Sequence, residues 1–176
     1  MIIPKKSLGQ NFLIDKNIVN KIIKYIKITN KNIIEIGPGM GFMTDEIIKQ
    51  KPKNLLLIEK DNDISRYLKK KYKNIKNIKV INQDFSNYKF INNNKVNIIS
   101  NLPYNVSTKI ILKLLKDRKF ISEMILMVQK EVGKKFNKNS KKNNKYKFLI
   151  NTLTNFNICF DVSNNVFYPK PKIQSS

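Results

Sequence analysis

The sequence predicts an α/β protein with a doubly wound, mostly parallel β-sheet. Short runs that are apolar on both faces alternate along the chain with segments of helical periodicity, as in βαβ units whose sheet is covered on both sides. With 176 residues, 41% of them apolar, the chain is long enough for one hydrophobic core and short for two. Residues 1–176 are therefore expected to form a single domain.

The first half of the chain is expected to contain three helices and three strands. Apolar residues at helical spacing follow Asp15, a favourable N-cap, and predict a helix that ends near Ile28. The remaining elements of this half are a strand at 32–36, a helix that begins at Thr44, a strand at 55–59, a helix at 63–72 and a strand at 78–82.

The second half continues the alternation. A buried strand is predicted at 96–100, and Ser107 is expected to cap the helix that follows it. Further along, the pattern predicts a strand at 123–129, a polar basic loop at 137–147, a helix at 148–156 and a strand at 158–162. Residues 172–176 resemble the beginning of one more strand, so the final strand is expected to be truncated.

Charge and composition indicate the kind of partner. The net charge is +23 and the sequence pI is near 10.0, so the surface attracts polyanions, of which nucleic acid is the default. The excess consists almost entirely of Lys, which favours phosphate attraction over base reading by Arg. Frequent Lys, Asn and Ile are also what an A/T-rich genome encodes, so mutational bias is the alternative explanation for part of the positive charge.

Missing residue types exclude several chemistries. The chain has no His, and Cys159 is its only cysteine, which argues against zinc, His-based acid–base catalysis and an internal disulfide. It has no apolar run of membrane-spanning length, and Met1–Lys6 does not resemble a secretory signal. The expected state is a monomer in a reducing cytoplasm, with no membrane and no metal.

A nucleoside pocket is predicted where three strands end. Gly37 and Gly39 belong to a G-x-G-x-G turn after the first strand of the sheet, Glu59 ends the second, and Asp84 and Phe85 follow the third. Glu59 suits two ribose hydroxyls, and Asp84 suits an adenine amine beside the apolar Phe85. The glycine spacing is not that of a phosphate-binding loop. A packing turn and solvated carboxylates are the alternatives, but together the residues fit S-adenosylmethionine.

A second candidate site follows the strand at 96–100. Asn101, Leu102, Pro103 and Tyr104 form a loop directly off its carboxyl end. Asn and Pro are common in turns, so a plain turn covered by Tyr104 is the alternative interpretation.

Six ordered motifs resemble those of the ribosomal RNA adenine N6-dimethyltransferases, most closely the small-subunit type. They are KKSLGQNFL at 5–13, EIGPGMG at 35–41, IEKD at 58–61, QDF at 83–85, NLPYNVST at 101–108 and FYPKPKI at 167–173. The resemblance implies a Rossmann-like S-adenosylmethionine-dependent methyltransferase. Its implied product is an N6-methylated pair of adjacent adenines in a small-subunit rRNA hairpin, and its implied partner is the precursor of that subunit.

The resemblance also implies which residues act. Cofactor contacts would fall on Asn11, Leu13, Gly37, Glu59, Asp84 and Asn101. The predicted nucleoside pocket adds Gly39 and Phe85 to these cofactor-binding residues. The Asn101 side-chain oxygen and the Leu102 carbonyl would accept the two amine hydrogens of adenine, and Pro103 would fix the backbone. Tyr104 would stack on the flipped-out base, and Phe167 would hold that base from the other side.

Two departures from the family pattern and three alternatives stand beside this interpretation. Tyr146 is followed by Lys147 and Phe148 instead of a Gly-x-Leu-Ser-like segment. The helical RNA-binding domain that follows the catalytic domain in this family is expected to be missing. The alternatives are large-subunit rRNA methylation of the macrolide-resistance type, a non-catalytic RNA-binding or transcription factor, and a DNA adenine methyltransferase. An intact NLPY loop argues against lost catalysis, and the segment at 10–13 favours RNA over DNA.

Overall fold

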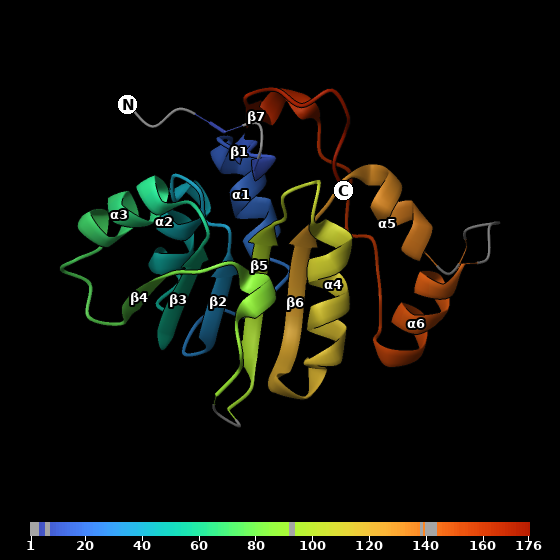
Figure 1. Ribbon diagram of the computed structural model, residues 1–176, viewed down its shortest axis with the longest axis horizontal. Coiled ribbons are helices and arrows are strands. Elements are labelled where there is room, and N and C mark those ends of the chain that lie inside the picture. Colours follow the sequence, from blue (N-terminus) through green and yellow to red (C-terminus); the bar gives the residue numbers. More distant parts are fainter. Residues whose placement is uncertain (1–3, 6–7, 92–93, 138, 140–143) are drawn as a thin grey trace.

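Five parallel strands form the central sheet of the protein, in the order β4-β3-β2-β5-β6. The computed structural model describes residues 4–5, 8–91, 94–137, 139 and 144–176. The strands are β2 (Asn32–Ile36), β3 (Asn54–Glu59), β4 (Ile78–Asn82), β5 (Val96–Asn101) and β6 (Ile121–Met127). Helices alternate with these strands along the chain, so the predicted doubly wound α/β fold is confirmed (Figure 1).

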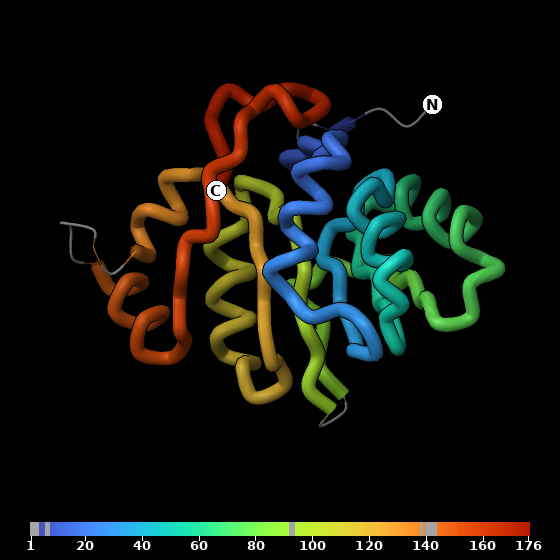
Figure 2. Tube along the Cα trace, turned by 180° about the vertical axis from the view of Figure 1, so that it is seen from behind, coloured from blue at the N-terminus to red at the C-terminus, as the bar shows by residue number. Residues whose placement is uncertain are grey.

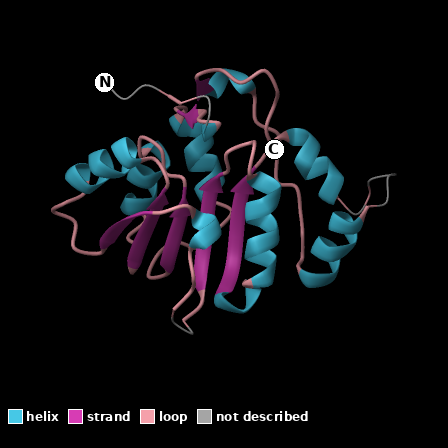
Figure 3. Cartoon of the chain, in the orientation of Figure 1, coloured by secondary structure: helices cyan, strands magenta, loops and turns pink. Residues whose placement is uncertain are grey.

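Helices cover both faces of this sheet, and the burial pattern of each strand explains how (Figures 2 and 3). Successive side chains of a strand point to opposite faces. Ile33 of β2 is accordingly buried with α1 (Lys16–Ile23), α2 (Phe42–Lys49) and α3 (Asn62–Lys71). Its neighbour Ile34 is buried with α4 (Ser107–Lys116), α5 (Lys130–Phe136) and α6 (Lys145–Leu153) on the other face.

The strand order reverses between β2 and β5. After β2 the chain adds β3 and β4 outward on one side, and it then returns to place β5 on the other side of β2. Ligands of open parallel sheets bind beyond the carboxyl ends of the strands at such a switch point. The loop after β2 carries the glycines, and Asn101 is the last residue of β5, so the topology places both candidate motifs at one opening.

A two-stranded antiparallel sheet lies beyond the carboxyl ends of the main strands (Figure 1). It pairs β1 (Phe12–Leu13) with β7 (Phe167–Tyr168), in the register Phe12 to Tyr168 and Leu13 to Phe167. Residues 12 and 13 are a loop in the sequence-based prediction, because two residues carry no periodicity. The pairing joins a segment near the start of the chain to one near its end.

Several local predictions are corrected by the structure. The helix after Asp15 ends at Ile23, while Asp15 does cap it by accepting the Ile18 N–H at 2.9 Å. Ser107 is the first residue of α4 and not its cap, because its hydroxyl donates backward to the Tyr104 carbonyl. Helix α2 begins at Phe42 instead of Thr44.

The last third of the chain differs most from the prediction. Helix α5 was not predicted, and α6 begins at Lys145, within the predicted basic loop. Residues 158–162 form no strand. Their one pairing is an isolated bridge between Val162 and Ser175. The predictions for residues 1–3, 6–7, 138 and 140–143 lie outside the described residues. In the described part of the chain, no helix is long and apolar enough to cross a membrane.

Candidate active site

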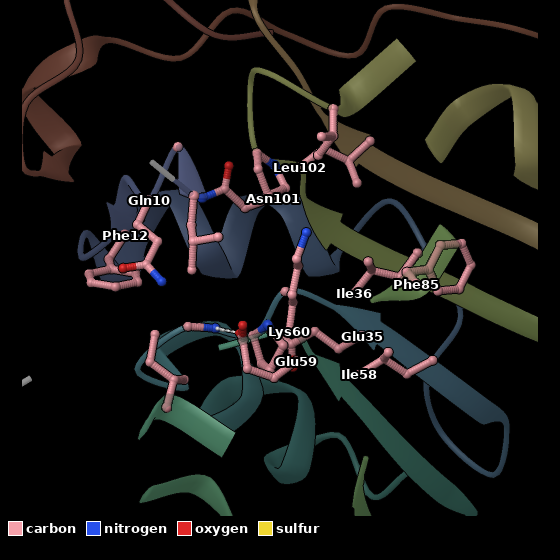
Figure 4. Close-up of a pocket in the computed structure, with 18 of the residues that line it drawn as sticks. Gln10, Phe12, Glu35, Ile36, Ile58, Glu59, Lys60, Phe85, Asn101 and Leu102 are labelled. Atoms are coloured by element: carbon pink, nitrogen blue, oxygen red, sulfur yellow. Dashed lines mark hydrogen bonds between the residues drawn. The ribbon is translucent and has the colours of Figure 1, made fainter. Parts of the chain in front are cut away.

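A pocket opens at the switch point, between the amino-terminal segment and the loops that follow four of the strands (Figure 4). Every predicted site residue except Phe167 lines it: Asn11, Leu13, Gly37, Gly39, Glu59, Asp84, Phe85, Asn101, Leu102, Pro103 and Tyr104. Residues from widely separated segments thus meet at one opening, as expected when parallel strands bring their carboxyl ends to the same edge.

The glycine turn shapes one wall of this pocket. Gly37 and Gly39 have φ angles of 65° and 55°, in the left-handed region that other residues adopt at a cost. A Cβ at Gly37 would have no heavy atom within 4 Å, whereas a Cβ at Gly39 would lie 2.7 Å from the Phe12 ring. Gly37 therefore leaves open space beside the backbone, and Gly39 lets the amino-terminal segment pack onto the turn.

Glu59 ends β3 with its carboxylate held by the backbone. Its side chain is 7% exposed, and it accepts the Asp61 N–H at 2.8 Å and the Gly39 N–H at 3.3 Å. Burial raises the pKa of this carboxyl, against the opposing effect of those two N–H groups. A carboxylate has about four acceptor positions, so Glu59 keeps capacity for hydroxyl donors from a ligand.

Asp84 lies at the neighbouring strand end and pairs with Lys60. The Lys60 ammonium is 2.9 Å from one Asp84 oxygen, and the other accepts the Ser86 N–H at 2.8 Å. Burial opposes ionisation here, but these partners outweigh it and hold the pKa of Asp84 below its usual range. Asp84 is therefore an ionised acceptor at the pocket wall, next to the buried ring of Phe85.

A third carboxyl, Glu35, lies at the floor of the pocket, although sequence reasoning assigned it no role. It is fully buried, and one oxygen accepts the Thr44 hydroxyl at 2.7 Å. The other oxygen has no hydrogen-bond partner among the described residues. Burial raises the pKa of Glu35 to about 8, so the carboxyl is mainly protonated at neutral pH. Its only signal in the sequence is an acidic residue within the otherwise apolar run of Ile33, Ile34 and Ile36.

The raised pKa of Glu35 makes stability pH-dependent. Between the unfolded value near 4.5 and the folded value of about 8, the folded state holds a proton that the unfolded state releases. Stability supplied by neutral Glu35 is thus complete below pH 4.5 and is lost as pH rises toward 8. Relative to Glu35→Gln, the wild-type free energy of unfolding should fall by about 1.4 kcal/mol per pH unit in this window. Urea unfolding at several pH values tests this, and parallel curves would contradict it.

The Asn101 side chain is oriented by a contact across the chain. Its Nδ2 donates to the Asn11 backbone carbonyl at 3.0 Å, which turns the Oδ1 acceptor away from that contact. The following residue, Leu102, is anchored by donating its N–H to the Met127 carbonyl at 3.0 Å. Figure 4 shows Asn101 and Leu102 on the opposite side of the pocket from Glu59. The Asn101 side chain and the Leu102 backbone are therefore both held in place by contacts with other segments.

Asp61 holds the amino-terminal segment against the pocket. The sequence analysis assigned no role to this residue. Its buried carboxylate forms an ion pair with Lys5 at 2.9 Å and accepts a hydrogen bond from Gln10 at 3.1 Å. The same carboxylate caps helix α3. Burial favours the neutral acid, but Lys5 and the other donors hold the pKa of Asp61 below its usual value. Asp61 thus links the loop after β3 to Lys5 and Gln10.

Phe167 is the one predicted site residue that the structure does not bring to the pocket. It is 3% exposed, pairs with Leu13 and packs in the core beneath the small sheet. The next residue, Tyr168, is 62% exposed. A contact of Phe167 with a base stays a prediction.

Solved structures with the same architecture define the class of protein. A dimethyladenosine transferase from Plasmodium falciparum superposes with a TM-score of 0.83 at 25% identity, over 93% of this chain and 60% of the other. The 23S rRNA methyltransferase ErmE superposes with a TM-score of 0.84 at 22% identity, over 94% of this chain and 67% of the other. The chain has the Rossmann-like fold of S-adenosylmethionine-dependent methyltransferases, as the sequence predicted.

The particular family follows from the sequence comparison. A family model described as ribosomal RNA adenine dimethylase matches residues 3–176. The chain belongs to this family, and the prediction from the six motifs is confirmed. Proteins named ribosomal RNA small subunit methyltransferase A are similar to it, at 38% identity in Hydrogenobaculum sp. (strain Y04AAS1) and 40% in Malacoplasma penetrans (strain HF-2). These matches cover 99% and 97% of this chain, which spans 69% and 63% of those relatives.

Proposed function

We propose that this chain transfers methyl groups from S-adenosylmethionine to the N6 amine of two adjacent adenines in a small-subunit rRNA hairpin, as a monomer in the cytoplasm. The observation that carries the proposal is the Asn101–Tyr104 loop at the switch point. Its Asn101 amide is anchored on Asn11, and its oxygen is left for a ligand. Family membership and the relatives named small subunit methyltransferase A support the substrate class.

The pocket suits this cofactor. The acidic side chains of Glu59 and Asp84 line it in a chain whose net charge is +23, so it favours a cationic ligand over phosphate. Gly37 leaves room for close approach. We assign the ribose hydroxyls to Glu59, the adenine amine to Asp84, the adenine face to Phe85, and further contacts to Asn11, Leu13, Gly39 and Asn101. When bound, S-adenosylmethionine supplies an electrophilic methyl group on a sulfonium.

The loop residues prepare the target amine. An adenine amine is a weak nucleophile because its lone pair is delocalised into the ring. Hydrogen bonds to the Asn101 Oδ1 and the Leu102 carbonyl favour a pyramidal nitrogen with a localised lone pair. Pro103 adds no competing N–H donor. Catalysis then depends mainly on positioning, and no histidine is required.

The direct test supplies labelled S-adenosylmethionine and small-subunit particles that lack the modification. Label should appear on two adjacent adenines in one hairpin of the small-subunit RNA, and mapping identifies the methylated bases. Label on large-subunit RNA or on DNA would instead support one of the alternative enzymes. Absence of label on every substrate, with a folded protein, would support a non-catalytic role.

The two pocket glycines are expected to respond differently to alanine. Gly37→Ala should lower the free energy of unfolding by about 1 kcal/mol, from the left-handed backbone alone. Gly39→Ala should lower it by about 2 kcal/mol, because Phe12 must also move. For cofactor affinity we expect the larger loss in Gly37→Ala, whose methyl would enter the pocket. Denaturant unfolding and calorimetry measure the two effects, and equal effects on both would contradict the assignment of the open space to the cofactor.

Binding to RNA is expected to depend strongly on salt and weakly on sequence. The net charge of +23 is supplied almost entirely by Lys, which attracts phosphates without reading bases. If about six phosphates are contacted, affinity should fall by roughly 10³-fold between about 50 and 200 mM salt. Fluorescence anisotropy with the target hairpin and with a scrambled hairpin measures both properties. A flat salt response, or a strong preference for one hairpin, would contradict this expectation.

A further inference from the structure

Tyr104 is tied to a residue far along the chain. Its hydroxyl and the Ser175 hydroxyl are 2.6 Å apart, and either one can be the donor. Tyr104 lines the pocket and is half-buried, whereas Ser175 is 0% exposed. A fully buried serine therefore reaches the far end of the ring that faces the site.

The backbone holds Ser175 firmly. Its N–H donates to the Val162 carbonyl at 3.1 Å, and its carbonyl accepts the Val162 N–H at 2.8 Å. On the other side, Ser175 also forms a bridge with Gln129, just after β6. Because these pairings use the backbone groups, the Ser175 hydroxyl is left for Tyr104.

A bond at this point controls the orientation of the ring. A tyrosine side chain has two main torsions, and a hydrogen bond at its tip fixes where the ring points. The hydroxyl of a phenol prefers the ring plane, so the same bond also resists rotation of that plane. At the other end, the Tyr104 carbonyl accepts the Ser107 hydroxyl at 3.3 Å. The Tyr104 backbone is thus anchored by Ser107, and the hydroxyl end of the ring is held by Ser175, before any base arrives.

We propose that Ser175 is a positioning residue for methyl transfer, which holds the Tyr104 ring in the orientation that stacks on the target adenine. This inference rests on the proposed function. Ser175 itself touches no reacting atom. Its effect is to reduce the number of ring orientations, so that more of the bound bases lie where the Asn101 loop can accept their amine hydrogens.

The test compares Ser175→Ala, Tyr104→Phe and the double variant with wild type. Each single variant should lower kcat about tenfold, because that factor corresponds to the net free energy of one hydrogen bond. The KM for S-adenosylmethionine should stay unchanged. The double variant should be no slower than either single one, because both remove the same bond. Ser175→Thr, which keeps a hydroxyl, should recover part of the rate.

Ser176→Ala is the matched control. The Ser176 hydroxyl donates to the Phe160 carbonyl at 3.4 Å, away from the pocket, so this variant should keep the wild-type kcat. Additive losses in the double variant, or equal losses in Ser176→Ala, would overturn the proposal. If Ser175→Ala fails to fold, Tyr104→Phe still removes the bond, because its half-buried ring keeps its shape.

A second measurement separates this inference from the proposed function. Hydrogen exchange of the amides at residues 104–107 should quicken in Ser175→Ala and Tyr104→Phe, but not in Ser176→Ala. Wild type that methylates no substrate would count against the function, while the exchange result still tests the tie between the two hydroxyls. Unchanged exchange together with unchanged kcat in both variants would overturn the role of Ser175 and leave the function standing.

Discussion

Replacing Asn101 with Ala is expected to lower the rate of methyl transfer about 100-fold or more at saturating cofactor, with little change in RNA affinity. Loss of one preorganised hydrogen-bonding group at a reacting centre typically costs about 10²–10³-fold in rate. RNA affinity depends mainly on Lys–phosphate attraction elsewhere on the surface, so it should barely move. Single-turnover methylation with excess enzyme measures the chemical step apart from binding.

Two checks make the Asn101 result interpretable. Because Asn101 also anchors Asn11, the affinity for S-adenosylmethionine must be measured for the variant by calorimetry. Asn77→Ala is a matched control, since its amide donates to the Pro52 carbonyl, outside the pocket. A near wild-type rate in Asn101→Ala would show that the loop is only a turn.

Replacing Glu59 with Ala should weaken binding of S-adenosylmethionine by about 1–3 kcal/mol, through loss of hydrogen bonds to a charged acceptor. The same change leaves the N–H groups of Gly39 and Asp61 without their acceptor. Glu59→Gln, which keeps the shape and one oxygen, should therefore lose less affinity and less stability than Glu59→Ala. Calorimetry for binding and thermal unfolding for stability separate the two effects.

Glu131→Ala is the control for this prediction, because Glu131 is an exposed residue of α5 outside the pocket. It should bind S-adenosylmethionine as wild type does. Unchanged affinity in a folded Glu59→Ala variant would remove Glu59 from the cofactor site.

Much of the fold was predictable because its strands are covered on both faces. Segment 55–58 is apolar throughout and 33–36 is interrupted only by Glu35, and this pattern identifies parallel strands without reference to the rest of the chain. Helix α5 escaped prediction because it is short, mostly polar and contains Gly133. The pairing of β1 with β7 escaped because each strand has two residues, and tertiary contact alone defines them.

The same distinction holds for the candidate site. Gly37, Glu59, Asp84 and Asn101 each lie at or just after the end of a recognisable strand, so their convergence follows from the topology of a parallel sheet. The contacts that hold them come from afar and leave no local signal, as Asn11 does for Asn101 and Lys5 for Asp61. Phe167 was placed by motif alone, and the structure pairs it with Leu13 in the core.

The pairing of β1 with β7 also has a consequence for synthesis of the protein. Phe12 leaves the ribosome early, but its partner Tyr168 emerges only after nearly the whole described chain has been translated. Contacts between residues so far apart in sequence form late and slowly. A nascent chain can assemble strands β2 to β5 while residues 8–13 still lack their partner, and the cofactor pocket closes last.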